Sequence, residues 1–195
     1  SKYNVVSPDA ICEDYGADAL RLYEMFLGPL EQYKPWNTSG ITGISSFLKK
    51  LWRLYVDNSG IKVSNEKPTE NSLKTLHRTI KKVTEDIEQF SFNTSVSNFM
   101  IAVNELSSQK CKSRDILEPL LVLISPYAPH IVEELWSLIG HKTSISNEKF
   151  PEFDAKYLHE SSKVYPISFN GKMRFTLELS LDLAKDEIEK LVLEN

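Results

Sequence analysis

Apolar residues recur every three or four positions through most of the chain, a period that predicts amphipathic helices. The two longest stripes begin at Ile44 and Leu73, and basic side chains fall mostly outside the apolar face of each. Asn93 or Thr94 is the expected cap of the helix that follows the second stripe. The pattern predicts helices over residues 8–16, 18–27, 44–55, 73–90, 96–106, 116–124 and 129–139.

The period changes after Gly140. From Lys163 apolar residues alternate with polar ones on both sides of Asn170-Gly171, the dipeptide that most favours a tight hairpin, and a helix is expected over 184–193. The predicted fold class is therefore mainly α: a helical bundle with a small α+β piece, a β-hairpin plus a helix. The expected organisation is a helical lead-in (1–40), the bundle (41–140), a connector (141–162) and the α+β piece (163–195).

Composition limits the classes of protein. The 195 residues are 41% hydrophobic and 26% charged, a globular mix. No apolar run approaches the roughly 20 residues of a membrane helix, and no basic and apolar leader opens the chain. Two cysteines are too few for a disulfide framework. A reduced, cytoplasmic location without a membrane partner is expected.

The net charge of −4 argues against a nucleic-acid ligand, but the charge is unevenly distributed. Residues 45–85 carry nine basic and four acidic side chains, net +5, inside an otherwise acidic chain. Such a segment forms either a local positive face for a polyanion or an ordinary solvated helix surface.

Catalytic motifs are missing from the sequence pattern. There is no phosphate-binding Gly-rich loop, and the histidines and cysteines lack metal-ligand spacing, so no metal is expected. His130, between Pro129 and Ile131, is expected to be a packing residue at a helix start. No nucleophile, base and oxyanion site come together.

Two motifs resemble the class I aminoacyl-tRNA synthetases. The opening residues 1–9 are similar to the segment that leaves the Lys-Met-Ser-Lys-Ser loop of these enzymes, of which Ser1 would be the last residue. Residues 18–21 read Asp-Ala-Leu-Arg, the tetrad that gives one name to their anticodon-binding domain. Both motifs fit the leucine, isoleucine, valine and methionine enzymes.

Further stretches favour the leucine enzymes of bacterial type. They are Tyr-Glu-Met-Phe-Leu-Gly-Pro-Leu-Glu-Gln (23–32), Lys-Pro-Trp (34–36), Phe-Asn-Thr-Ser-Val (92–96), the run from Pro126 to Trp136, and Asn-Gly-Lys-Met-Arg (170–174). The last resembles Asn-Gly-Lys-Val-Arg in the family's small C-terminal domain, which normally continues well beyond this point.

The resemblance implies a tRNA-docking fragment. The parent enzyme would join leucine to tRNA(Leu) through a leucyl-adenylate, with ATP and Mg²⁺, and the fragment would contact the parent's catalytic and editing domains while being catalytically inert. Because the leucine enzymes rely little on the anticodon, recognition by shape and backbone is expected. The candidate tRNA-binding residues are Lys49, Lys50, Arg53, Arg78, Lys81, Lys82, Lys172 and Arg174.

Two alternatives remain open from the sequence. One is the same region of a valine or isoleucine enzyme, and the other is a helical bundle that binds only proteins. Trp52 and Trp136 lie on apolar stripes and are expected in the core rather than stacked on bases. Arg21 is expected to link its helix to the catalytic core of the parent enzyme rather than to contact tRNA.

Overall fold

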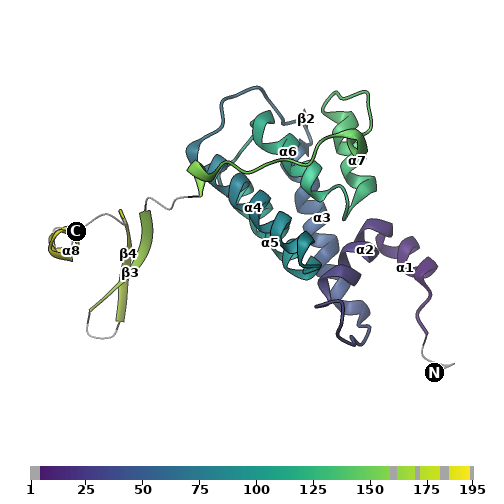
Figure 1. Ribbon diagram of the computed structural model, residues 1–195, viewed down its shortest axis with the longest axis horizontal. Helices are drawn as coiled ribbons and strands as arrows, with labels where there is room; N and C mark the ends of the chain where they lie inside the picture. The colour runs from purple at the N-terminus through teal and green to yellow at the C-terminus, as the bar shows by residue number, and fades with distance from the viewer. Residues whose placement is uncertain (1–4, 159–161, 170–171, 181–184, 194–195) are drawn as a thin grey trace. The chain divides into compact units, whose positions relative to one another are not determined.

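The computed structural model describes residues 5–158, 162–169, 172–180 and 185–193. It divides into two compact units, residues 1–154 and 155–195. Both are drawn in Figure 1, and the predicted mainly α class is confirmed. The elements of the first unit are α1 (Pro8–Tyr15), α2 (Ala17–Phe26), η1 (Thr38–Gly40), α3 (Ile41–Tyr55), β1 (Val56–Asp57), β2 (Gly60–Ile61), α4 (Glu70–Glu88), α5 (Phe92–Ser108), α6 (Arg114–Ile124), α7 (Pro129–Leu138) and η2 (Ile145–Asn147).

The helices of the first unit bury a single apolar core. Helix α4 packs along α5, α3 crosses α5, and α6 packs against α4 and α7. The largest fully buried side chains include Tyr55, Tyr127 and Phe99, and the core as a whole extends from Ile11 to Ile145. Trp136 is 4% exposed and Trp52 packs on the core from its edge, so the predicted core role of both is confirmed.

Several helices begin earlier than predicted, among them α3 to α6. Helix α3 begins at Ile41 rather than Ile44, because the side chain of Asn37 accepts the amide of Ser39 and a 3₁₀ turn leads directly into the helix. Helix α5 begins at Phe92, with Ser91 rather than Asn93 or Thr94 at its cap position. The preceding helix ends in a left-handed residue, Phe90 (φ 55°), which lets the chain reverse within three residues.

The Asp-Ala-Leu-Arg tetrad on α2 holds the turn between α6 and α7. Asp18, which is buried, accepts the amides of His130 at 3.3 Å and of Ile131 at 2.7 Å, both in the first turn of α7. These amides have no partner within their own helix, so Asp18 acts as a cap supplied by another helix. Arg21 donates to the carbonyls of Pro126 (2.8 Å) and Tyr127 (3.4 Å). Arg21 therefore bonds a turn of its own unit, and its predicted link to the catalytic core stays a prediction.

The prediction for His130 is wrong. Its side chain is 72% exposed instead of packed, and the ring Nδ1 lies 2.8 Å from Asp18 Oδ1. The carboxylate already binds the backbone of the first turn of α7, and the ring reaches it from the solvent side.

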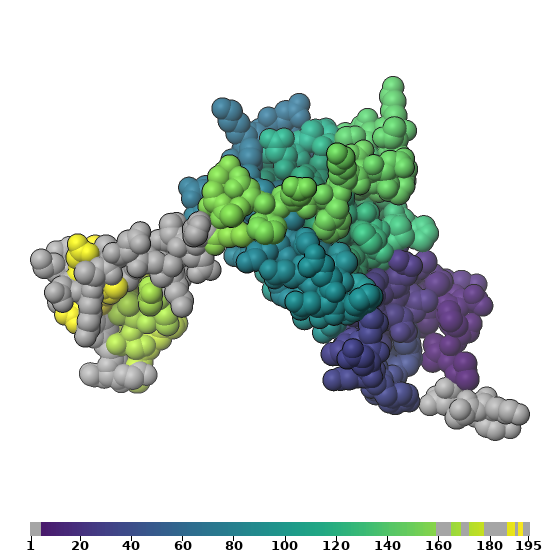
Figure 2. All heavy atoms as spheres, viewed as in Figure 1, coloured from purple at the N-terminus to yellow at the C-terminus, as the bar shows by residue number. Residues whose placement is uncertain are grey.

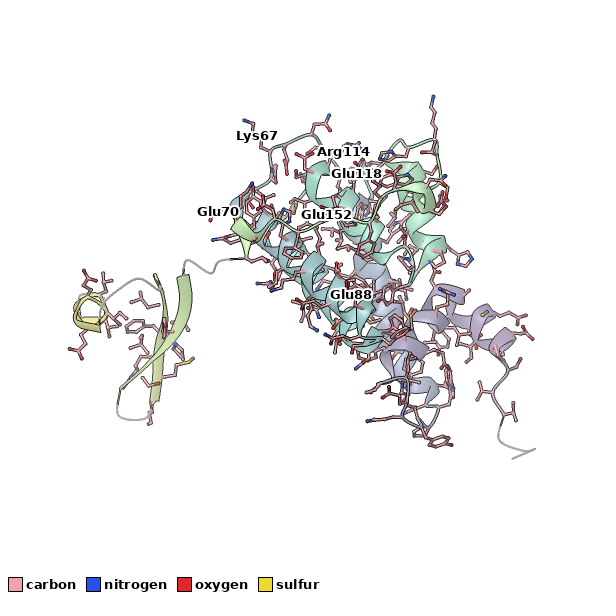
Figure 3. The ribbon with its side chains drawn as sticks, viewed as in Figure 1. Lys67, Glu70, Glu88, Arg114, Glu118 and Glu152 are labelled. Atoms are coloured by element: carbon pink, nitrogen blue, oxygen red, sulfur yellow. The ribbon has the colours of Figure 1, made fainter. Side chains whose placement is uncertain are left out.

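Residues 141–154 run across the helices from α7 toward α4, as Figures 1 and 2 show. The ring of His141 stacks on Trp136 at 3.6 Å, and its Nε2 lies 2.6 Å from Glu118 Oε1. Glu118 also pairs with Arg114 one turn earlier on α6 (Figure 3). At the far end, the amide of Asp154 donates to His77 Nδ1 at 3.1 Å. The segment is thus fastened to the helical unit at both ends.

The second unit holds η3 (Ala155–Tyr157), β3 (Ser162–Phe169), β4 (Lys172–Ser180) and α8 (Lys185–Leu193). The two strands pair antiparallel, which confirms the predicted hairpin, and α8 matches the expected closing helix. Asn170 and Gly171 of the turn lie outside the described residues, as does Ser1.

Candidate nucleic-acid interface

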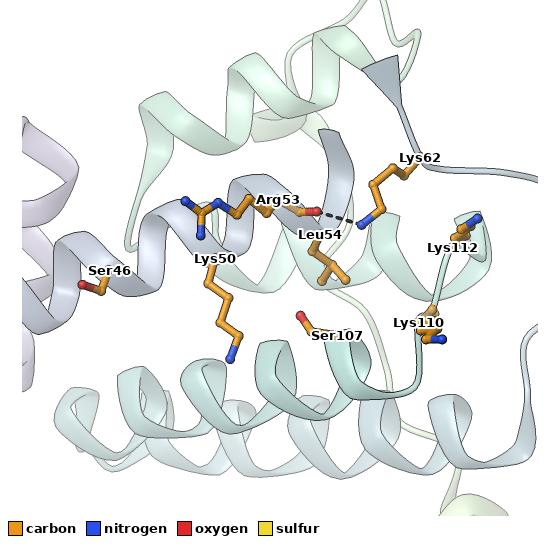
Figure 4. Close-up of a pocket in the computed structure, with 9 residues that line it drawn as sticks. Ser46, Lys50, Arg53, Leu54, Lys62, Ser107, Lys110 and Lys112 are labelled. Carbon is orange, nitrogen blue, oxygen red and sulfur yellow. Dashed lines mark hydrogen bonds between the residues drawn. The ribbon is translucent and has the colours of Figure 1, made fainter. Parts of the chain in front are cut away.

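A basic groove lies between α3 and the C-terminal part of α5. It has a volume of about 640 Å³, and five of its nine lining residues are basic. Figure 4 shows Lys50 extending from α3 toward α5, and Lys62 meeting the end of α3. The lining residues are Ser46, Lys50, Arg53, Leu54, Lys62, Ser107, Lys110, Cys111 and Lys112. No acidic residue is among them, and we call this feature the α3–α5 groove.

Two of the predicted residues on α3 reach this groove. Lys50 and Arg53 are exposed and lie three positions apart, so they share one helix face. The ammonium of Lys50 donates to Asn104 Oδ1 on α5 at 2.5 Å. Lys49 is also exposed but does not line the groove.

Two loops bring the other three cations to the groove. Lys62 follows the short β1–β2 hairpin, and its ammonium donates to the carbonyl of Arg53 at 2.9 Å. A parallel bridge joins Ser64 to Ser113, where the amide of Ser64 donates to the carbonyl of Lys112 at 2.8 Å. The turn after α5 is therefore held beside the hairpin, which places Lys110 and Lys112 near Lys62.

Lys110 has a left-handed backbone (φ 54°) just after the end of α5. The next amide, that of Cys111, donates back to the carbonyl of Leu106 at 3.0 Å and closes the end of the helix. Glycine is the residue that best tolerates this position, and a side chain there is strained.

The pKa values of two titratable groups near the groove, Cys111 and Asp57, are shifted in opposite directions. Burial raises the pKa of the Cys111 thiol above its ordinary value, so the neutral thiol is favoured despite the neighbouring lysines. The pKa of Asp57, beyond the groove, is lowered mainly by the hydrogen bond from the Ser59 hydroxyl, with Lys62 and Lys112 adding to the effect. The lysines therefore give this surface a positive potential.

The predicted cations on α4 are in a different environment. Arg78 bonds both carboxylate oxygens of Glu105, at 2.6 and 2.7 Å. Lys81 lies 3.8 Å from Glu85. Lys82 pairs with Asp86, a carboxylate that is 1% exposed. The α4 cluster is therefore balanced by acids of its own unit.

Lys172 and Arg174 are exposed on β4 of the second unit. The strand register shifts between Ile167 and Ser168, which leaves Arg174 without a Cα partner. Such a bulge interrupts the two-residue alternation, so the spacing of Lys172 and Arg174 does not place them on one strand face.

Sequence reasoning missed Lys62, Lys110 and Lys112. Lys62 lies in the basic segment but in a loop, where no helical face marks it. The other two form a Lys-Cys-Lys run inside a segment of net charge −5, so counting charge by segment conceals them. Among the described residues, no three His, Cys, Asp or Glu side chains gather as a metal-binding group.

Residues 70–190, more than half of the chain, match the family described as the anticodon-binding domain of tRNA ligase, and the chain belongs to this family. It is 70% identical over 193 residues to the leucine–tRNA ligase of Christiangramia forsetii, and 69% identical over 195 residues to that of Flavobacterium johnsoniae. These alignments cover 99% and 100% of the chain but 20% of each relative. The predicted resemblance to the leucine enzymes is confirmed.

A solved structure shares the fold. It is the ternary complex of LeuRS, tRNA and LeuAMS from Agrobacterium radiobacter, 30% identical with a TM-score of 0.72. The match covers 98% of this chain and 26% of that one. In the part of the chain that the structure describes, no helix combines the length and apolarity needed to cross a bilayer.

Proposed function

We propose that this chain is the tRNA-docking part of a leucine–tRNA ligase, which attaches leucine to tRNA(Leu) through leucyl-adenylate with ATP and Mg²⁺. The observation that carries the proposal is the 70% identity to a leucine–tRNA ligase over nearly the whole chain. Since the chain spans about a fifth of that relative, adenylate formation is assigned to other parts of the ligase, which acts in the cytoplasm.

While other parts of the ligase form the adenylate, the helical unit of this chain binds tRNA. RNA binding needs cations that are free to meet phosphates. Lys50 and Arg53 meet that need at the α3–α5 groove, and Lys49 lies beside them on α3. Arg78, Lys81 and Lys82 meet it less well, because each would give up an internal carboxylate partner. Lys172 and Arg174 are exposed and supply a further contact from the hairpin.

The two alternatives have less support. A valine or isoleucine enzyme is disfavoured because the relatives aligned over the whole chain are leucine–tRNA ligases. A bundle that binds only proteins is disfavoured because the chain belongs to an anticodon-binding family.

Amino-acid charging by the full-length ligase tests the proposal. Purified ligase should charge tRNA with leucine, and should show leucine-dependent exchange of pyrophosphate into ATP. The 195-residue chain alone, the matched control, should show neither activity. Charging with valine or isoleucine in place of leucine would contradict the assignment, and exchange by the isolated chain would show that the division of labour is wrong.

A further inference from the structure

We propose that the α3–α5 groove is a binding site for successive backbone phosphates of RNA, in which Lys62, Lys110 and Lys112 act together with Lys50 and Arg53. The inference rests on the proposed function, which supplies the tRNA. It adds three residues from two loops to the candidates on α3, and it assigns the groove to phosphate rather than base recognition.

The first argument is the balance of charge. Five cations converge on one groove that no carboxylate lines, and their mutual repulsion is only partly relieved by Asp57 and Glu66 outside the lining. The α4 cations differ, since Arg78, Lys81 and Lys82 each have an acidic partner. A polyanion would balance the positive charge that these two acids leave uncompensated.

Favourable interaction with a helix C-terminus explains the position of only some of the five cations. Lysines near a helix C-terminus are favoured by the helix dipole, and Lys62 does bond the carbonyl of Arg53 at the end of α3. The side chains of Arg53, Lys110 and Lys112 have no hydrogen bond or ion pair to any described residue. They are available to a ligand.

The second argument is the backbone of Lys110. Its left-handed conformation favours glycine, and lysine is present instead. Strain of this kind is common at functional sites, and here, unlike at Phe90, the strained residue is a cation that lines a groove. The conformation directs the turn so that Lys110 lines the groove together with Lys112.

The lining also indicates what is recognised. It contains no aromatic side chain on which a base could stack, whereas the hydroxyl of Ser107 can donate a hydrogen bond to a phosphate oxygen; that of Ser46 already donates to the carbonyl of Thr42 at 2.9 Å. Contacts of this type fix the position of an RNA without reading its bases.

The test is titration of the full-length ligase with tRNA(Leu) transcript at several salt concentrations. Lys110→Gln and Lys112→Gln should each weaken binding and lower the slope of log K against log salt by about 0.7–0.9. The matched control is Lys142→Gln, an exposed lysine outside the groove, which should change neither quantity. An unchanged slope in both groove variants, or an equal loss in the control, would overturn the proposal.

Lys110→Gly separates ligand binding from folding. Glycine relieves the left-handed strain, so the variant should raise the unfolding temperature of the 195-residue chain by about 2 °C. It should nevertheless weaken tRNA binding as much as Lys110→Gln. If the lysine serves only the helix end, Lys110→Gly will bind tRNA like the wild type, and the proposal is wrong.

A second polyanion distinguishes RNA from an acidic protein surface. Polyglutamate of similar charge is titrated against the same variants. If they lose affinity for polyglutamate while tRNA binding keeps its slope, the groove is a protein site and the proposal fails. Charging assays on the same preparations distinguish failure of one proposal from failure of the other. Normal leucylation with an unchanged salt slope rejects only the groove. A reduced salt slope in a protein that does not charge tRNA with leucine rejects only the ligase assignment.

Discussion

At the scale of single residues, Asp18 has a structural role that its charge alone would not suggest. Its buried carboxylate accepts two amides of α7 and contacts the ring of His130. Asp18→Ala would leave those amides without a partner, and we expect a loss of about 1–3 kcal/mol in the free energy of unfolding. Urea denaturation of the 195-residue chain measures it. Asp9→Ala, at an exposed position in α1, is the control, and an equal loss in both variants would contradict the capping role.

Also at this scale, Cys111 should be an unreactive thiol. Burial raises its pKa, so less thiolate is present at a given pH than in the unfolded chain, and thiolate is the form that reacts. In a Cys12→Ser background, iodoacetamide at pH 8 should alkylate Cys111 much more slowly in the folded chain than in urea. Because the unfolded thiol releases its proton first, stability should also fall as the pH rises above the ordinary thiol value. Equal alkylation rates in the two states would show that the thiol is not protected.

At the scale of elements, α3 and α4 carry similar numbers of exposed cations but differ in their partners. Changing Lys49, Lys50 and Arg53 together to Gln should weaken tRNA binding by the full-length ligase and flatten its salt dependence. The matched triple change of Arg78, Lys81 and Lys82 should have a smaller effect on binding, because their charges are already neutralised by acids. Leucine-dependent pyrophosphate exchange, which needs no tRNA, should be unchanged in both. A larger effect from α4 would place docking on that helix.

At the scale of the whole molecule, we expect residues 141–154 to add to the free energy of unfolding of the helical unit. The sequence predicts a bundle that ends at residue 140, and this boundary stays a prediction. Residues 141–154 add the stacking of His141 on Trp136 and the buried side chain of Ile145. A chain of residues 1–154 should therefore unfold at nearly the same urea concentration as the 195-residue chain, and a chain of 1–140 at a clearly lower one. Equal midpoints for the two shortened chains would show that the segment does not contribute.

The sequence by itself determined the helices, the hairpin and the family. These features depend on local periodicity, on turn chemistry such as Asn170-Gly171, and on linear motifs such as residues 18–21, all of which can be read along the chain. Helix starts were less well determined. The 3₁₀ turn before Ile41 depends on a hydrogen bond from Ser39 to the Asn37 side chain, and the turn before α5 depends on the left-handed Phe90, a conformation that residues other than glycine rarely adopt.

Only the tertiary structure decided which cations lie close together without forming an ion pair. Lys62 is far in the sequence from Lys110 and Lys112, and the bridge between Ser64 and Ser113 brings their two loops together. In the same way, the pairing of Arg78 with Glu105 depends on α4 packing against α5, and the cap that Asp18 provides depends on α2 meeting α7. Charge compensation and capping act over a few ångströms in space, so they are set by the packing of the helices and not by spacing along the chain.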